Sequence, residues 1–262
     1  MPKVSEKVRS RIWSLQTQIG KGILDGTHDP KKLAEVLQAF LEKKGEKNEF
    51  ATLEPEQAIN ILGQNKVITA EQAAKAWSIE EPQNAAIRYS EATLLTCAEQ
   101  NKSGEDWRLV YCHGLSLREQ RDKRGTSQNS QPCFYKGNTW WLEHSEDKWA
   151  SHKAQTGYYL INFRGQFSDM NWNEQEQEIT KLGKEYERCH EAVFNETILT
   201  IFMVNNGERI AEDWWHWGIS LDSFGNRVRV GNFDAHGLRV SSGWDDYSHR
   251  YLSVALVRKF EN

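Results

Sequence analysis

The 262-residue chain has no apolar run long enough to cross a membrane, and its first residues, MPKVSEKVRSRIWSLQ, lack the apolar core of a signal peptide. We therefore expect a cytoplasmic protein without membrane insertion. Its four cysteines are widely scattered, which predicts reduced structural thiols in that compartment; they are Cys97, Cys112, Cys133 and Cys189. The net charge of -4 gives no electrostatic case for nucleic-acid binding.

The most informative absence is local. Between Glu212 and Lys259, 46 residues contain no Lys, Glu, Gln or Met, although these types make up 62 of the 262 residues and proportional sampling would place about 11 there. β-Structure disfavours Lys and Glu and explains part of the deficit. It does not explain the five Asp in the same stretch, because Asp is less favourable in strands than Glu, although turns accept it.

A codon constraint fits the absence better. Codons that end in a pyrimidine cannot encode Lys, Glu, Gln, Met or Trp. Apolar residues fall at every second position of much of 228–256, as in strands buried on one face, and the miscellaneous residues between them all belong to the set that such codons encode. Trp217 and Trp244 would then be fixed positions outside the variable set.

The segment WGISLDSFGNRVRVGNFDAHGLRVSSGWDDYSHRYLSVALVRKF resembles the variable region of a diversity-generating retroelement target protein. In that family an error-prone reverse transcriptase copies a template repeat and misincorporates opposite adenines, and the products overwrite the 3′ end of the target gene. The resemblance covers roughly residues 210–260. It implies a C-type-lectin-like fold that holds diversified side chains on a fixed scaffold, and it adds release inside a phage particle as an alternative location.

The resemblance divides the variable region, 213–258, into framework and contact positions. The framework positions carry the apolar alternation and the turn residues: Trp217, Gly218, Leu221, Asp222, Gly225, Val228, Val230, Gly231, Phe233, Asp234, Gly237, Leu238, Val240, Trp244, Asp245, Leu252, Val254, Arg258 and Phe260. The candidate contact residues are Phe224, Asn226, Arg229, Asn232, Ala235, His236, Arg239, Ser241, Ser242, Gly243, Asp246, Tyr247, Ser248, His249, Arg250, Tyr251 and Ser253. Tyr, Ser, Asn, Gly and Arg are residue types that binding surfaces favour.

The sequence predicts an α+β protein in two parts. Residues 1–85 form an all-helical module for tethering, oligomerisation or docking, and residues 86–262 form the C-type-lectin-like domain. Helices are expected at Ser5–Leu24, after Asp29-Pro30, at Glu54–Leu62 before Gly63, and at Ala70–Trp77 with Thr69 as N-cap.

Further elements are predicted in the second part. Helices are expected at Ser90–Asn101, Leu115–Lys123 and Trp172–Ala192, with Asn195 ending the last. Strands are expected at Trp107–Cys112, Trp140-Trp141, Tyr158–Phe163 and Ile198–Val204, followed by short strands from Trp214 onward.

The expected function is selective binding of a protein, less so of a glycan, without catalysis, cofactor or metal. The histidines and aspartates match no compact zinc pattern, and no Gly-x-Ser-x-Gly motif occurs. A fixed-specificity lectin-like module or phage receptor-recognition module remains an alternative, since Trp244-Asp245-Asp246 is faintly similar to a calcium-lectin element. An uncharacterised hydrolase is a third possibility. The ligand and the oligomeric state are left open.

Overall fold

The computed structural model describes residues 53–83, 85–143 and 148–261. The chain divides into two units, Met1–Ala51 and Thr52–Asn262, and the described residues lie in the second. The helices expected at Ser5–Leu24 and after Asp29-Pro30 fall outside the described residues. No helix in the described part is both long and apolar enough to cross a membrane.

Helices and strands are interspersed along the first part of the described chain, and its last four elements are strands. The helices are α3 (Pro55–Leu62), α4 (Ala70–Trp77), α5 (Glu91–Lys102), α6 (Leu117–Arg124), α7 (Trp140–Glu143), α8 (Trp172–Leu182) and α9 (Glu191–Val204), with short 3₁₀ turns at Gln64–Lys66 and Lys148–Ser151. The strands are β1 (Val67–Ile68), β2 (Trp107–Cys112), β3 (Gly157–Gln166), β4 (Tyr186–Arg188), β5 (Trp215–Leu221), β6 (Arg227–Asp234), β7 (Gly237–Gly243) and β8 (Leu252–Arg258). The fold class is therefore mixed α+β.

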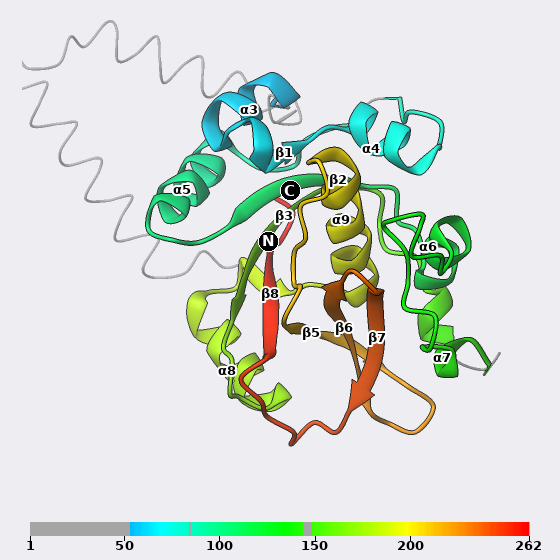
Figure 1. Ribbon diagram of the computed structural model, residues 1–262. Coiled ribbons are helices and arrows are strands. Elements are labelled where there is room, and N and C mark those ends of the chain that lie inside the picture. Colours follow the sequence, from blue (N-terminus) through cyan, green and yellow to red (C-terminus); the bar gives the residue numbers. More distant parts are fainter. Residues whose placement is uncertain (1–52, 84, 144–147, 262) are drawn as a thin grey trace, which may run out of the picture. The chain divides into compact units, whose positions relative to one another are not determined.

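The strands form one mixed sheet in the order β1-β2-β3-β8-β5-β6-β7, and β4 pairs with β8 off this path (Figure 1). The β1–β2 and β5–β8 pairs are parallel, and the other pairs are antiparallel. Strand β8 contacts β3 along one edge and both β4 and β5 along the other, and its residues Leu252 to Val257 are all buried. It is the central strand of the fold.

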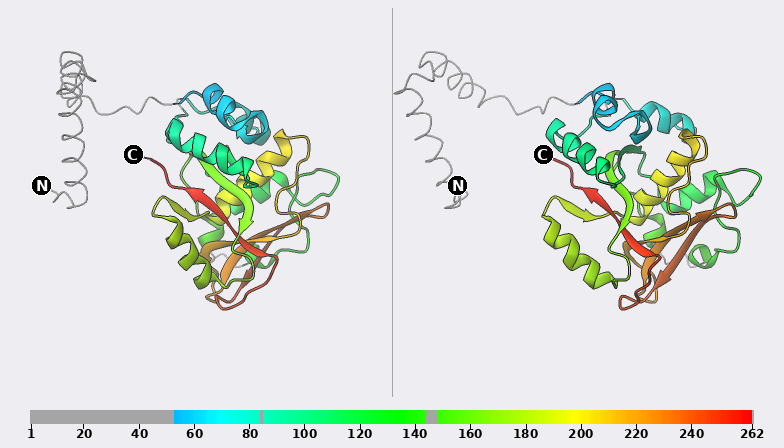
Figure 2. Two further views of the ribbon diagram at one scale, coloured as in Figure 1. Left: turned by 90° about the vertical axis from the view of Figure 1, so that its left-hand side faces the viewer. Right: turned by 60° about the vertical axis from the view of Figure 1, so that its left-hand side comes forward.

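Helices cover the sheet unequally. Helix α9 packs against β2, β5 and β6 and contacts α4 and α6, whereas α8 packs beside β4. Figures 1 and 2 show α8 and α9 on opposite sides of β8. Because α9 lies behind both halves of the sheet, its residues Glu191 to Ile201 are all buried.

The structure places residues 53–83 with the sheet rather than in a module that ends at residue 85. Strand β1 pairs with β2, α3 packs on α5, and α4 packs on α9. Leu53 also forms an isolated bridge with Ile87. The boundary between the two units of the chain falls at residues 51 and 52.

Several predicted elements are confirmed where local signals are strong. Helix α4 has Thr69 as N-cap, with its hydroxyl accepting from Gln72 N–H, and α3 is followed by Gly63 at a φ of 103°. Helices α5 and α6 and strands β2 and β3 also match their predicted segments within a few residues.

Three predicted elements are wrong. Ile198–Val204 belongs to α9, and Trp140-Trp141 to α7. The expected helix 172–192 is instead α8, which ends before Gly183, followed by β4 and the start of α9, so Asn195 lies inside a helix. A helix buried all round shows no polar face, and for this reason the apolar run of α9 could not be distinguished from a strand by its pattern.

The β5–β8 pairing that joins the two halves of the sheet is short, and His216 extends it. Only two residue pairs connect these strands. The buried His216 imidazole lies 2.8 Å through Nε2 from the Cys189 carbonyl oxygen and 3.0 Å through Nδ1 from the Ala255 nitrogen. Because Ala255 N–H can only donate, Nδ1 accepts and Nε2–H donates, so the ring is neutral. Burial lowers the pKa of His216 to about 3.

This burial predicts a pH dependence of stability. In the unfolded chain His216 is protonated below its ordinary pKa of 6.5, whereas in the folded chain it stays neutral down to about pH 3. The free energy of unfolding therefore decreases as the pH falls from 6.5 towards 3. The loss approaches about 1.4 kcal/mol per pH unit. We expect His216→Gln, which can donate and accept but does not titrate, to flatten this dependence in urea unfolding measured from pH 7 to pH 4.

The buried Glu196 changes the pH dependence of stability in the opposite direction. Burial raises the pKa of its carboxyl to about 7, so its contribution favours the folded state at low pH and is lost as the pH rises through 7. The comparison of wild type with His216→Gln isolates the imidazole, because Glu196 is common to both. Identical pH slopes in the two proteins would contradict the assignment.

Candidate ligand-binding surface

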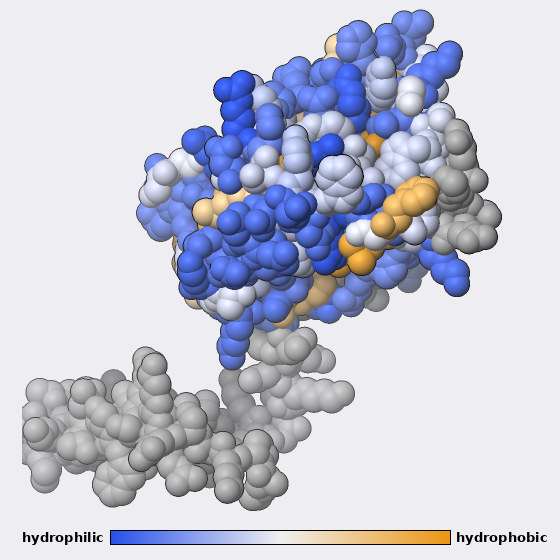
Figure 3. Space-filling view, turned by 90° about the horizontal axis from the view of Figure 1, so that it is seen from below, coloured by the Kyte–Doolittle hydropathy of each residue, from blue (hydrophilic) through white to orange (hydrophobic). Residues whose placement is uncertain are grey.

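Exposed large hydrophobic side chains gather at one end of the described domain. Of the eight among the described residues, six belong to the region 213–258, namely Ile219, Leu221, Phe224, Trp244, Tyr247 and Tyr251. They come from the end of β5, the β5–β6 turn and the β7–β8 loop. Figure 3 views this end and shows apolar (orange) and pale side chains close together within hydrophilic surroundings. We call this surface the apolar end; contiguous exposed apolar surface of this kind marks interaction sites.

Most of the candidate contact residues are accessible. Nine of the seventeen are exposed: Phe224, Ala235, His236, Asp246, Tyr247, Ser248, His249, Arg250 and Tyr251. Seven are partly buried: Asn226, Arg229, Asn232, Arg239, Ser241, Ser242 and Gly243. Ser253 differs from the expectation, because it pairs with His216 inside the β5–β8 contact and is 4% exposed. It is not available to a ligand.

The structure does not bring the candidate residues into one surface. Residues of the β5–β6 turn, the end of β7 and the β7–β8 loop meet at the apolar end. Asn232, Ala235, His236 and Arg239 lie at the opposite end of the β6–β7 hairpin, where Asp234 pairs with Gly237. Asn226 and Asn232 are six residues apart along this part of the chain, which corresponds to roughly 20 Å at about 3.3 Å per residue.

The framework residues form the scaffold beneath. Twelve of the nineteen are buried: Trp217, Gly218, Asp222, Val228, Val230, Gly231, Phe233, Gly237, Leu238, Val240, Leu252 and Val254. Asp222 fixes the β5–β6 turn, since its Oδ1 accepts from Phe224 N–H at 2.9 Å and from Asn226 N–H at 2.8 Å. Trp244 departs from its expected scaffold role, because its side chain is 72% exposed at the apolar end.

One ion pair and two backbone hydrogen bonds hold the β7–β8 loop, residues 244–251, in which no strand is present. Asp245 pairs through Oδ1 with Arg227 Nε at 3.1 Å, and its carbonyl accepts from Trp172 N–H at 3.0 Å. The His249 carbonyl accepts from Asp169 N–H at 3.4 Å. Arg227 also lies 3.8 Å above the Trp172 ring and donates to the Ile219 carbonyl at 2.8 Å. The position of the loop therefore depends on the start of α8.

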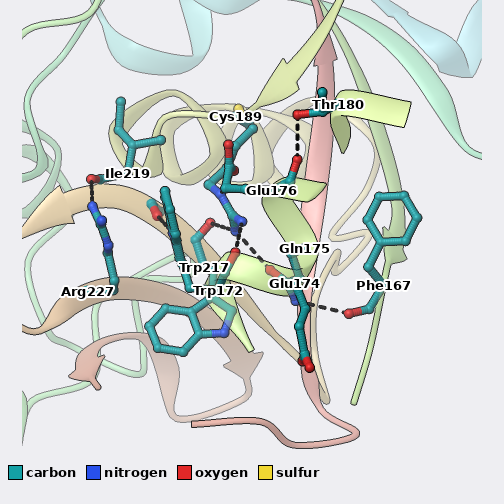
Figure 4. Close-up of polar contacts among 12 residues, drawn as sticks. Phe167, Trp172, Glu174, Gln175, Glu176, Thr180, Cys189, Trp217, Ile219 and Arg227 are labelled. Atoms are coloured by element: carbon teal, nitrogen blue, oxygen red, sulfur yellow. Dashed lines mark hydrogen bonds and ion pairs between the residues drawn. The ribbon is translucent and has the colours of Figure 1, made fainter. Parts of the chain in front are cut away.

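A buried arginine in turn fixes that start of α8. Arg188 Nε donates to Glu176 at 2.7 Å, and Arg188 Nη1 donates to Gln175 at 2.9 Å. Its guanidinium also contacts the Trp172 carbonyl and lies 4.6 Å from the Trp172 ring centre. Figure 4 shows Trp172, Gln175 and Glu176 converging on this network, with Arg227 and Ile219 beside it. Burial lowers the pKa of Arg188 to about 10, so the group stays charged at neutral pH.

Arg188, Trp172 and Arg227 are functional residues that no sequence pattern identifies. Arg188 and Trp172 lie outside the variable region, and their convergence depends on tertiary structure. For Arg227 the sequence does offer a partial indication of a supporting role, because this charged residue directly precedes the alternating framework positions of β6.

A cavity of about 550 Å³ lies beside α8 and the start of α9, apart from the apolar end. Its walls include His152 and His190, whose rings stack with centroids 4.8 Å apart. Cys189 also lines it, but burial raises the pKa of this thiol well above its ordinary value, which disfavours a thiolate nucleophile. Its Arg188 is paired with Glu176. The Cys189 thiol donates to the His190 carbonyl oxygen at 3.6 Å and is not hydrogen-bonded to a base.

Within the described part of the chain, no group of three or more His, Cys, Asp or Glu is placed to hold a metal ion. Asp245 of the faintly calcium-lectin-like element is paired with Arg227.

Comparisons with protein-family models, with curated proteins and with solved structures find no match to this chain. The residues at the apolar end are therefore the basis for a functional assignment.

The anchoring of the loop generates a prediction for Arg227→Ala. Removing a hydrogen-bonded charge costs about 1.5–3 kcal/mol, less where it is partly exposed, and about 1.4 kcal/mol corresponds to tenfold. We expect amides of residues 244–251 to exchange about tenfold faster with solvent deuterium, measured by mass spectrometry. Arg250→Ala, in an exposed position of the same loop, is the control and should leave exchange within twofold of wild type. Unchanged exchange in Arg227→Ala would contradict the anchoring role.

Proposed function

We propose that this protein binds a protein ligand through a hypervariable surface at the apolar end, generated by retroelement mutagenesis. One observation carries the proposal. The positions that the resemblance assigns to the framework and to contact differ in burial: twelve of nineteen framework residues are buried, against one of seventeen contact residues. The missing Lys, Glu, Gln and Met supply independent support, because burial alone does not remove these types from exposed positions.

The chemistry of the surface suits a protein ligand. Phe224, Trp244, Tyr247 and Tyr251 provide large rigid areas at 74%, 72%, 41% and 40% exposure. Aromatic residues of this kind carry much of the binding energy at protein interfaces, because they bury large areas and lose little conformational entropy. Serine, asparagine and histidine beside them add adaptable hydrogen bonding.

A C-type-lectin-like scaffold is part of the same proposal. It rests on the resemblance of residues 210–260 and on a mixed α+β sheet whose buried framework supports exposed turns. In such an arrangement the exposed side chains can be exchanged, because each contributes contacts without supporting the core. The proposed activity is binding without turnover.

The proposal predicts where selected ligands bind. A random peptide library displayed on phage is selected against the immobilised full chain, and affinities of the enriched peptides are measured by calorimetry. We expect Trp244→Ala and Tyr247→Ala to weaken binding at least tenfold, since truncating an interface aromatic costs about 1–2 kcal/mol or more. The melting temperature should change by less than about 2 °C, because surface substitutions stay within about 0.5 kcal/mol.

Leu95→Ala provides the matched control. Leu95 is 49% exposed but lies on α5, outside the apolar end. Its truncation should leave the affinity unchanged. Peptides that depend on Leu95 and not on Trp244, or a library that yields no binder, would count against the proposed function.

A further inference from the structure

A cavity of about 240 Å³ opens at the apolar end beneath Trp244 and Tyr247. Its remaining walls are Asn226, Arg229, Ser242 and Gly243. Every lining residue except Trp244 belongs to the candidate contact set. The volume is below the roughly 300–1,000 Å³ of pockets that enclose whole small molecules. The cavity is therefore of the size for a single side chain.

Arg229 is the unusual member of this wall. Its Nε atom is buried without a hydrogen-bond partner, and no carboxylate among the described residues lies within ion-pair distance of it. Its guanidinium instead lies 5.3 Å from the Trp215 ring centre and 5.6 Å from that of Tyr247. Burial lowers the pKa of Arg229, and the nearby Tyr247 hydroxyl, to which the guanidinium donates a hydrogen bond, offsets this only in part.

Neighbouring arginines of the same region show the contrast. Arg227 pairs with Asp245 at 3.1 Å, and Arg239 pairs with Asp234 at 3.0 Å. Asp245, the carboxylate of the β7–β8 loop that pairs with a described arginine, is thus already engaged by Arg227 and does not neutralise Arg229. A partly buried cation without a counter-charge is unfavourable unless a ligand supplies one.

We infer that this cavity receives the carboxylate side chain of an Asp or Glu from the protein ligand, which pairs with Arg229. The inference rests on the proposed function and names the ligand group that it recognises. A guanidinium binds a planar carboxylate through two parallel N–H···O bonds, and Ser242 and Asn226 can donate further hydrogen bonds. The rings of Trp244 and Tyr247 would shield the pair from water and strengthen it.

Two isosteric probes test the pocket directly. The ¹⁵N-labelled full chain is titrated with Ac-Glu-NH₂, with Ac-Gln-NH₂ and with inorganic phosphate, and the indole N–H signal of Trp244 is followed after assignment through Trp244→Phe. We expect saturable shifts with Ac-Glu-NH₂ at a dissociation constant at least tenfold below that of Ac-Gln-NH₂. Arg229→Gln should abolish this preference, and Arg250→Gln should retain it.

Equal responses to the two probes, a preference that survives Arg229→Gln, tighter binding of phosphate, or the absence of a saturable shift would each overturn the inference. The selected peptides separate this result from the proposed function. Peptides that need Trp244 but bind Arg229→Gln as well as wild type would refute the carboxylate pocket and leave the proposed function standing. Peptides indifferent to Trp244 would refute the proposed function, while the probe titration still decides the pocket.

Discussion

The parallel contact between β5 and β8 determines where the apolar end lies. Strands β5, β6 and β7 reach the rest of the sheet through only two residue pairs, supplemented by the neutral imidazole of His216 between Cys189 and Ala255. Strand β8 also pairs with β3 and β4, so the contact connects the hairpins to a strand whose residues Leu252 to Val257 are all buried. A short connection of this kind is sufficient because the imidazole provides two further hydrogen bonds inside the core.

The turns beyond this contact are fixed by side-chain contacts and by isolated backbone hydrogen bonds rather than by strand pairing. Asp222 closes the β5–β6 turn, and Asp245 ties the β7–β8 loop to Arg227 and to the first turn of α8. The buried Arg188 holds that turn of α8 in place. We therefore expect substitutions of exposed side chains in the loop, such as Tyr247 and Tyr251, to cost little stability. On this account Arg227 belongs with the fixed positions, although pyrimidine-ending codons can encode arginine.

Local signals and burial explain how much of this could be predicted from the sequence. Helix α4, with Thr69 as its cap, and the alternating strands β6 and β7 carry their periodicity openly. Helix α9 is buried on every side, so its apolar run lacked the polar face that marks a helix. At the site, residue types identified most exposed positions. They could not reveal that Ser253 lies inside the β5–β8 contact, or that Arg188 supports the loop, because both facts depend on long-range packing.

Sequencing the native locus around this gene would test whether residues 213–258 combine a fixed scaffold with diversified contact positions. We predict a nearby near-copy of codons 213–258 that differs chiefly at its adenines, accompanied by a reverse transcriptase gene. The differing codons should fall on candidate contact residues such as Phe224, Tyr247 and Tyr251, and should spare Asp222, Arg227, Trp244 and Asp245. A locus with neither repeat nor reverse transcriptase would contradict the account and favour a binding module of fixed specificity.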